Sequence, residues 1–136
     1  MEKPFEILVA DRNPHVRELI RRELAAVGYR VSLANNGREL LRWAYQSDSL
    51  DLVILDPDLF DVDGSLALRK LKNRIPFVPV VVHAFRSDCD DHPDFLQTAA
   101  FVEKRGSSVA RLKEVISDIL KRRHLRRIVD PNTPQP

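Results

Sequence analysis

The feature that most constrains the fold is a regular alternation between short apolar runs and segments in which apolar residues recur at helical spacing. The runs have the length of strands, and the segments between them are too long for hairpin turns. Successive strands must therefore lie parallel and be joined by helices that cross over the sheet. The sequence predicts an α/β protein whose doubly wound parallel sheet has helices on both faces.

The same pattern predicts where the strands and helices lie. Five strands are expected, at residues 7–10, 29–34, 52–55, 79–84 and 101–102. Five helices are expected between and after them: residues 14–27, a second after the turn at 35–37, a third after Gly64, a short fourth at 93–99, and a last one from Ser107 or Ser108.

The length of 136 residues fits one domain, predicted over residues 1–128, and the proline-rich residues 129–136 are expected to be disordered. The one cysteine, Cys89, is interpreted as a loop thiol. A single cysteine excludes a disulfide within the chain and fits a reducing, cytoplasmic compartment. No apolar run is long enough to cross a membrane, and the first residues lack the apolar run of a signal peptide, so neither a membrane span nor an export signal is expected.

The net charge of +2 is unevenly distributed, because residues 121–127 contribute +5 and the rest of the chain carries −3. A mildly acidic body with a basic end differs from the basic surface of a nucleic-acid-binding domain, so nucleic acid is not an expected partner. The basic segment is interpreted as the solvated last turns of a helix, where cations offset the helix dipole.

Polar side chains fall at the carboxyl ends of four predicted strands. Asp11 follows the first strand and Asp56 follows the third. His83 lies at the end of the fourth strand, and Lys104 comes directly after the fifth. Because the carboxyl ends of parallel strands meet at one edge of the sheet, these side chains are expected to form a single site.

Two carboxylates and a lysine in one pocket suit phosphoryl transfer. An aspartate can attack a phosphorylated donor and form an acyl phosphate, and the charge on the phosphoryl oxygens must then be neutralised. Two carboxylates about 4 Å apart repel each other by roughly 4 kcal/mol at an effective dielectric constant of about 20, so a cation is expected with them. Mg²⁺ suits such an all-oxygen pocket, and Lys104 would supply a mobile positive charge to a phosphoryl oxygen.

The sequence resembles the response-regulator receiver family of two-component signalling over nearly all of residues 5–120. The resemblance rests on ILVADR around Asp11, DLVILDPDLFDVDG around Asp56, PVVVHA around His83 and FVEK ending at Lys104. It implies a flavodoxin-like fold with strand order 2-1-3-4-5. It also implies that Asp56 is the phosphoacceptor, that Lys104 contacts the phosphoryl group, and that Mg²⁺ binds to Asp11, Asp56 and the backbone carbonyl of Asp58.

Several positions depart from the family pattern. His83 stands where the family has the serine or threonine that hydrogen-bonds the phosphoryl group, and with Phe101, at the aromatic position coupled to activation, it forms the expected switch. Phe60 and Arg105 stand where the family usually has proline. Arg12 replaces the second of two adjacent acids, so Mg²⁺ binding is expected to be weak.

Two conformations of Arg12 remain open from the sequence. Its guanidinium group either folds over the pocket and pairs with Asp11 or Asp56, or points to solvent like most loop arginines. In the first case the arginine stands in for the missing cation, and the side chain of Asp58 is an additional candidate metal ligand.

These features predict a single-domain receiver protein in a two-component phosphorelay. It would accept a phosphoryl group on Asp56 from a sensor histidine kinase and then change its binding to a downstream protein, acting as a signalling protein rather than an enzyme, with dimerisation allowed. The four departures favour an alternative, a pseudo-receiver that binds proteins without being phosphorylated. A phosphatase of the haloacid dehalogenase type, suggested by Asp56-Pro57-Asp58, is disfavoured because that family needs a longer chain with further acids.

Overall fold

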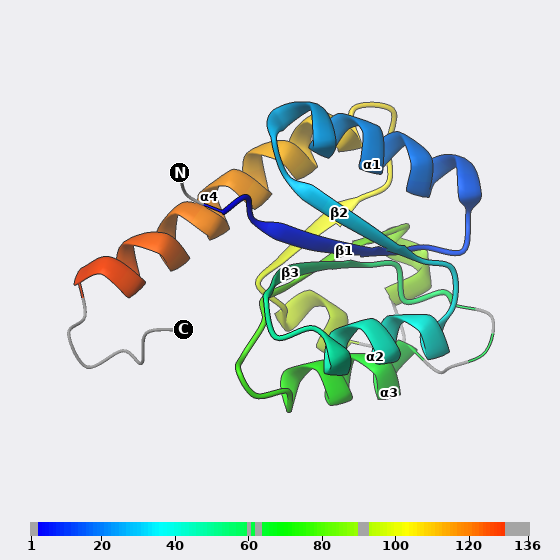
Figure 1. Cartoon of the computed structure of the whole chain (residues 1–136). Coiled ribbons are helices and arrows are strands. Elements are labelled where there is room, and N and C mark those ends of the chain that lie inside the picture. Colours follow the sequence, from blue (N-terminus) through cyan, green and yellow to red (C-terminus); the bar gives the residue numbers. More distant parts are fainter. Residues whose placement is uncertain (1–2, 60, 62–63, 90–92, 130–136) are drawn as a thin grey trace.

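A computed structural model describes residues 3–59, 61, 64–89 and 93–129 of the chain (Figure 1). All five strands pair in parallel in one sheet of order β2-β1-β3-β4-β5, which confirms the predicted doubly wound fold. The strands are β1 (Glu6–Ala10), β2 (Arg30–Ala34), β3 (Leu50–Leu55), β4 (Val80–Ala84) and β5 (Ala100–Glu103). The helices are α1 (Pro14–Val27), α2 (Gly37–Gln46), α3 (Gly64–Lys72) and α4 (Ser108–Val129), with the short 3-10 helices η1 (Arg86–Cys89) and η2 (Pro93–Gln97).

The sheet separates two apolar layers because successive side chains of a strand point to opposite faces. Helices α1 and α4 cover one face and helices α2 and α3 cover the other (Figure 1). In β1, Leu8 and Ala10 belong to the cluster under α2 and α3, whereas Ile7 and Val9 belong to the cluster under α1 and α4. This two-sided burial explains why β1, β3 and β4 read as nearly continuous apolar runs.

The prediction of five α-helices is wrong for the fourth, because residues 93–97 form the 3-10 helix η2 and the described residues contain four α-helices. Only two residues separate η2 from β5, and the hydroxyl group of Thr98 lies 3.2 Å from the carbonyl oxygen of Phe95 and 2.9 Å from that of Ala100. Such side-chain hydrogen bonds compete with continuation of a helix. Cys89 was expected in a loop, but it ends η1 and is buried in the same cluster as Phe95.

Helix α1 has a defined cap at each of its ends. Asn13 caps α1, and its side-chain oxygen accepts hydrogen bonds from the amides of His15 at 2.9 Å and Val16 at 3.3 Å. At the other end of the helix, Gly28 adopts a φ of 109°, which residues with a side chain rarely tolerate. The cap at Asn13 places the two preceding residues at the carboxyl edge of the sheet.

Helix α4 has 22 residues and its last turns extend past the sheet (Figure 1). The guanidinium group of Arg123 donates a hydrogen bond to the carbonyl oxygen of Phe77 at 3.1 Å, and the ring of His124 meets that of Phe5 edge-on at 6.3 Å. Residues 130–136, predicted as a disordered tail, lie outside the described residues, and Val129 is the last residue of α4. None of the helices in the described part of the chain has the length and apolar character needed to cross a membrane.

Arg74 is a buried cation that connects the end of α2 with the loop before β4. Its guanidinium group donates hydrogen bonds to the carbonyl oxygens of Ala44, Ser47 and Pro76, and only 4% of the residue is exposed. The first two carbonyls lie at the carboxyl end of α2, where backbone acceptors have no partner within the helix. The side chain therefore ties α2 to the loop that leads into β4.

We expect Arg74→Met to lower the free energy of unfolding by about 2 kcal/mol, because it leaves carbonyl groups without their donors. Urea unfolding followed by circular dichroism measures the change. Arg69→Met is the matched control, since Arg69 is exposed on α3 and its loss is expected to cost less than about 0.5 kcal/mol. Equal effects of the two substitutions would contradict a structural role for Arg74.

Candidate functional site

The carboxyl edge of the sheet positions the candidate site through backbone hydrogen bonds. The amide of Asp11 donates to the carbonyl oxygen of Ala34 at 3.2 Å, so Asp11 remains aligned with β2 after β1 ends. The amide of Asp56 donates to Ala10 at 2.8 Å, and the amide of Lys104 donates to the carbonyl oxygen of the last residue of β4 at 2.9 Å. Each of the three residues is thus held at the point where its strand leaves the sheet.

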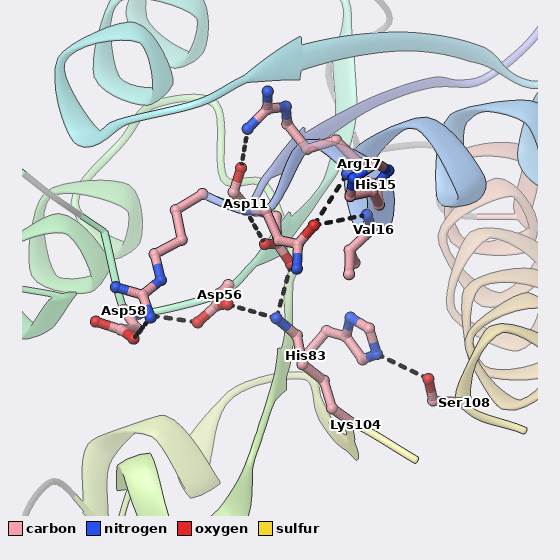
Figure 2. A network of polar contacts seen from close by, with 11 residues as sticks. Asp11, His15, Val16, Arg17, Asp56, Asp58, His83, Lys104 and Ser108 are labelled. Carbon is pink, nitrogen blue, oxygen red and sulfur yellow. Dashed lines mark hydrogen bonds and ion pairs between the residues drawn. The ribbon is translucent and has the colours of Figure 1, made fainter. Parts of the chain in front are cut away.

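The structure brings Asp11, Asp56 and Lys104 into direct contact, as their positions at strand ends predict (Figure 2). The ammonium group of Lys104 lies 2.9 Å from Oδ2 of Asp11 and 2.6 Å from Oδ2 of Asp56. The two aspartates are only 2% and 5% exposed. Lys104, whose side chain is 12% exposed, therefore bridges two buried carboxylates that are far apart in the sequence.

The second oxygen of each aspartate is bound by the backbone two residues further along the chain. Oδ1 of Asp11 accepts a hydrogen bond from the amide of Asn13 at 2.8 Å, and Oδ1 of Asp56 accepts one from the amide of Asp58 at 2.9 Å. Arg17 also donates to the backbone carbonyl oxygen of Asp11 at 2.7 Å. Both carboxylates therefore have a defined orientation, with one oxygen on the backbone and the other on Lys104.

The electrostatics of the site reflect its burial. Burial raises the pKa of Asp56 above its ordinary value, although the hydrogen bonds from Lys104 and from the amide of Asp58 act in the opposite direction. Burial alone would lower the pKa of Lys104, but its hydrogen bonds and charge interactions with Asp56 and Asp11 outweigh burial and raise it. Lys104 is therefore a permanent cation at neutral pH.

Arg12 adopts neither of the two conformations expected from the sequence. Its guanidinium group lies 3.2 Å from Oδ2 of Asp58, and about half of each side chain is exposed, at 47% and 44%. Arg12 therefore stays at the site, but it pairs with the carboxylate two residues after Asp56 rather than with Asp11 or Asp56. This pairing depends on a tertiary contact between two loops, which the spacing of residues cannot predict.

The carboxylates that would hold a magnesium ion already have cationic partners. Lys104 lies against the carboxylates of Asp11 and Asp56, and the carboxylate of Asp58 faces Arg12. Among the described residues, no three carboxylate, imidazole or thiol side chains are grouped so that they could hold a metal ion. A divalent cation would have to compete with one ammonium and one guanidinium group for its oxygen ligands.

His83 lies on the same edge of the sheet but interacts in another direction (Figure 2). Its Nε2 atom lies 3.0 Å from the hydroxyl oxygen of Ser108, at the start of α4. The residue is 2% exposed, and Nδ1 has no hydrogen-bond partner among the described residues. Burial, with a smaller effect of the positive charge on Lys104, lowers the pKa of His83 to about 4, so its imidazole is neutral at pH 7.

One aromatic residue contacts the site, and a second lies on β5 three residues before Lys104. The ring of Phe85 is half exposed and its centroid lies 5.7 Å from the ammonium group of Lys104. Phe101, the predicted switch residue, is half-buried on β5, and the guanidinium carbon of Arg86 lies 5.6 Å from its centroid. Phe60 lies outside the described residues.

Sequence reasoning missed two residues that shape the site. Ser108 was expected only as a possible helix cap, yet it is the partner of His83. Phe85 directly follows the end of β4, just as Lys104 directly follows the end of the neighbouring strand β5. These equivalent positions were the available sequence signal that the two residues would lie close together.

A family model and related proteins of known name both match this sequence. The sequence model of the response regulator receiver domain matches residues 7–117. The response regulator MprA of Mycolicibacterium vanbaalenii is 36% identical over 97 residues, which are 71% of this chain and 42% of that protein. The DNA-binding transcriptional regulator NtrC of Escherichia coli is 30% identical over 95 residues, which are 70% of this chain and 20% of that protein. The chain thus spans less than half the length of these relatives.

Solved structures show the same arrangement of the chain. The response regulator protein TrrA of Thermotoga maritima, in complex with Mg²⁺-BeF, superposes with a TM-score of 0.75 at 26% identity, covering 85% of this chain and 98% of that one. TrrA in complex with the histidine kinase ThkA gives a TM-score of 0.74 at 27% identity, covering 85% and 98% of the two chains.

Proposed function

Because this chain belongs to the response regulator receiver domain family, we propose that it receives a phosphoryl group on Asp56 from a histidine kinase and in response changes its binding to a downstream protein. The observation that carries this proposal is the bridge between Asp11, Lys104 and Asp56 at the carboxyl edge of the sheet. The complex of TrrA with a histidine kinase supports a kinase as the donor.

The proposed chemistry is a transfer from a phosphorylated histidine to a carboxylate. An oxygen of Asp56 forms a bond to phosphorus while the phosphorus–nitrogen bond of the donor breaks. The electron pair of that bond stays on the imidazole nitrogen, which takes a proton from water, and Asp56 becomes an acyl phosphate. Lys104 already touches Asp56, so its ammonium group can move to a phosphoryl oxygen over a short distance.

Phosphorylation would also alter the contacts that hold the site together. In the unmodified protein, Lys104 binds Asp56 and Asp11 at the same time. A phosphoryl group on Asp56 adds oxygens that compete for this lysine, so the loop after β5 is expected to shift. We assign the read-out of this shift to His83 and Phe101, which lie on the neighbouring strands β4 and β5. Magnesium binding is expected to be weak, because the carboxylates already have cationic partners.

We expect phosphoramidate, a small donor with a phosphorus–nitrogen bond, to add one phosphoryl group to the full chain, detectable by intact-mass spectrometry. Asp56→Asn should abolish this gain in mass, because an amide is not a nucleophile towards phosphorus. Asp48→Asn is the matched control and should be labelled like the wild type, since Asp48 is an exposed residue after α2.

Labelling that persists in Asp56→Asn, or that is absent from the wild type with both phosphoramidate and a phosphorylated kinase, would overturn the proposal. In the second case, a protein that still binds its partner would be acting without phosphorylation, as a pseudo-receiver.

A further inference from the structure

The positive charges around Asp56 come from two side chains on different loops. Lys104 approaches Oδ2 of Asp56 from the loop after β5. Arg12 reaches from the loop after β1 to Asp58, whose backbone amide donates to the other oxygen of Asp56. The segment that carries Asp56 is therefore contacted by an ammonium group on one side and a guanidinium group on the other.

A phosphoryl group on Asp56 would need this positive charge. The side chains of Asp11, Asp56 and Lys104 together carry one net negative charge, and a phosphoryl group adds further negative charge to a buried site. An arginine in place of a carboxylate raises the charge of a site by two units, which equals the charge of one divalent cation. Arg12 thus offers by itself much of the compensation that a metal ion would otherwise supply.

Building on the proposed function, we propose that Arg12 and Lys104 together hold the phosphoryl oxygens on Asp56, so that this site binds a phosphoryl group without a divalent cation. The guanidinium group has a planar set of donors that matches two oxygens of a phosphoryl group. It touches those oxygens directly in the occupied state, whereas in the unmodified protein it is paired with Asp58.

The exchange of Asp58 for a phosphoryl group is energetically accessible. The Arg12–Asp58 pair is about half exposed, and exposed pairs contribute at most about 1 kcal/mol. Hydrogen bonds from a guanidinium group to a phosphoryl group are stronger, because the acceptor carries more charge and the site is less solvated. Arg12 can therefore leave Asp58 when the stronger acceptor arrives.

The test uses the beryllium trifluoride anion, a phosphoryl mimic, and follows its binding to the full chain by fluorine NMR with EDTA and with millimolar magnesium. We expect the wild type to bind the anion with nearly the same affinity in both solutions. Arg12→Asp should lose about tenfold or more in affinity with EDTA, the worth of one charge-assisted hydrogen bond, and should recover it when magnesium is added. Arg22→Asp is the matched control, because it makes the same change of charge at an exposed position of α1 and should behave like the wild type.

The outcomes separate this inference from the proposed function. If the wild type binds only with magnesium, or if Arg12→Asp binds equally well with EDTA, the inference is wrong while the phosphoacceptor role of Asp56 stands. Equal losses in Arg12→Asp and Arg22→Asp would also overturn it, because the effect would then be one of overall charge. If no variant binds the anion in either solution and phosphoramidate labels nothing, the proposed function itself fails.

Discussion

Replacing Lys104 with methionine is expected to lower the free energy of unfolding by about 4 kcal/mol at pH 7, because it leaves two buried carboxylates without their shared cation. Lys104 lies within 2.9 Å of Asp11 and 2.6 Å of Asp56, and both aspartates are almost fully buried. Methionine keeps much of the volume of the lysine side chain, so the loss reports charge rather than packing. Urea unfolding at constant ionic strength measures the change.

The pH dependence of this variant provides a second test. Burial already raises the pKa of Asp56, and loss of Lys104 raises it further. A carboxyl group whose pKa is higher in the folded state takes up a proton more readily there than in the unfolded chain. The destabilisation is therefore fully present above the folded pKa of Asp56, and it should shrink as the pH falls from 7 towards about 4.

A double variant identifies the source of the effect. Adding Asp56→Asn to Lys104→Met removes one of the uncompensated charges, so part of the lost stability should return at pH 7. An additive double variant would show that Lys104 stabilises the protein through something other than these carboxylates. A single variant that is as stable as the wild type would remove the basis for the buried bridge.

The fold was predictable from the sequence because local periodicity carries the necessary information. Apolar runs such as Leu52–Leu55 are buried on both faces of the sheet. The segments between these runs are too long for hairpin turns, so they form crossover helices. The convergence of Asp11, Asp56 and Lys104 followed from topology, since the ends of parallel strands meet at one edge. The length and type of η2 were harder, because Thr98 ends the turn by side-chain hydrogen bonds that periodicity does not encode.

The direction of single side chains at the site could not be predicted from spacing. Arg12 had two plausible conformations, and the structure shows a third, in which Asp58 is the partner. His83 was expected to face a phosphoryl group, yet it bonds to Ser108, a residue 25 positions later in the chain. Both results depend on tertiary contacts between residues that lie far apart in the sequence. Such contacts decide how the site works, although they leave the fold unchanged.

His83 is expected to make the protein sensitive to acid. Its imidazole is nearly fully buried, and burial together with the charge on Lys104 lowers its pKa to about 4. The unfolded chain takes up this proton near the ordinary value of 6.5, so protons favour unfolding between these two values. The stability linked to His83 is therefore fully present above about pH 6.5 and falls by about 3 kcal/mol as the pH approaches 4.

His83→Gln isolates this contribution, because glutamine can still hydrogen-bond to Ser108 but does not titrate. Urea unfolding at several values between pH 7 and pH 4 should show that the variant loses about 3 kcal/mol less than the wild type over this range. The raised pKa of Asp56 acts in the opposite direction, but it is common to both proteins and largely cancels in the difference. The exposed residue His15 offers a control, since His15→Gln should leave the wild-type profile unchanged.

Parallel curves for the wild type and His83→Gln would contradict this account, because they would mean that the imidazole can be charged in the folded protein without cost. The expected difference has a structural reason. A proton on Nδ1 would need an acceptor, and the described residues place none there. A neutral His83 also adds no positive charge beside Lys104 at neutral pH. Compensation of a phosphoryl group on Asp56 is then left to Lys104 and Arg12.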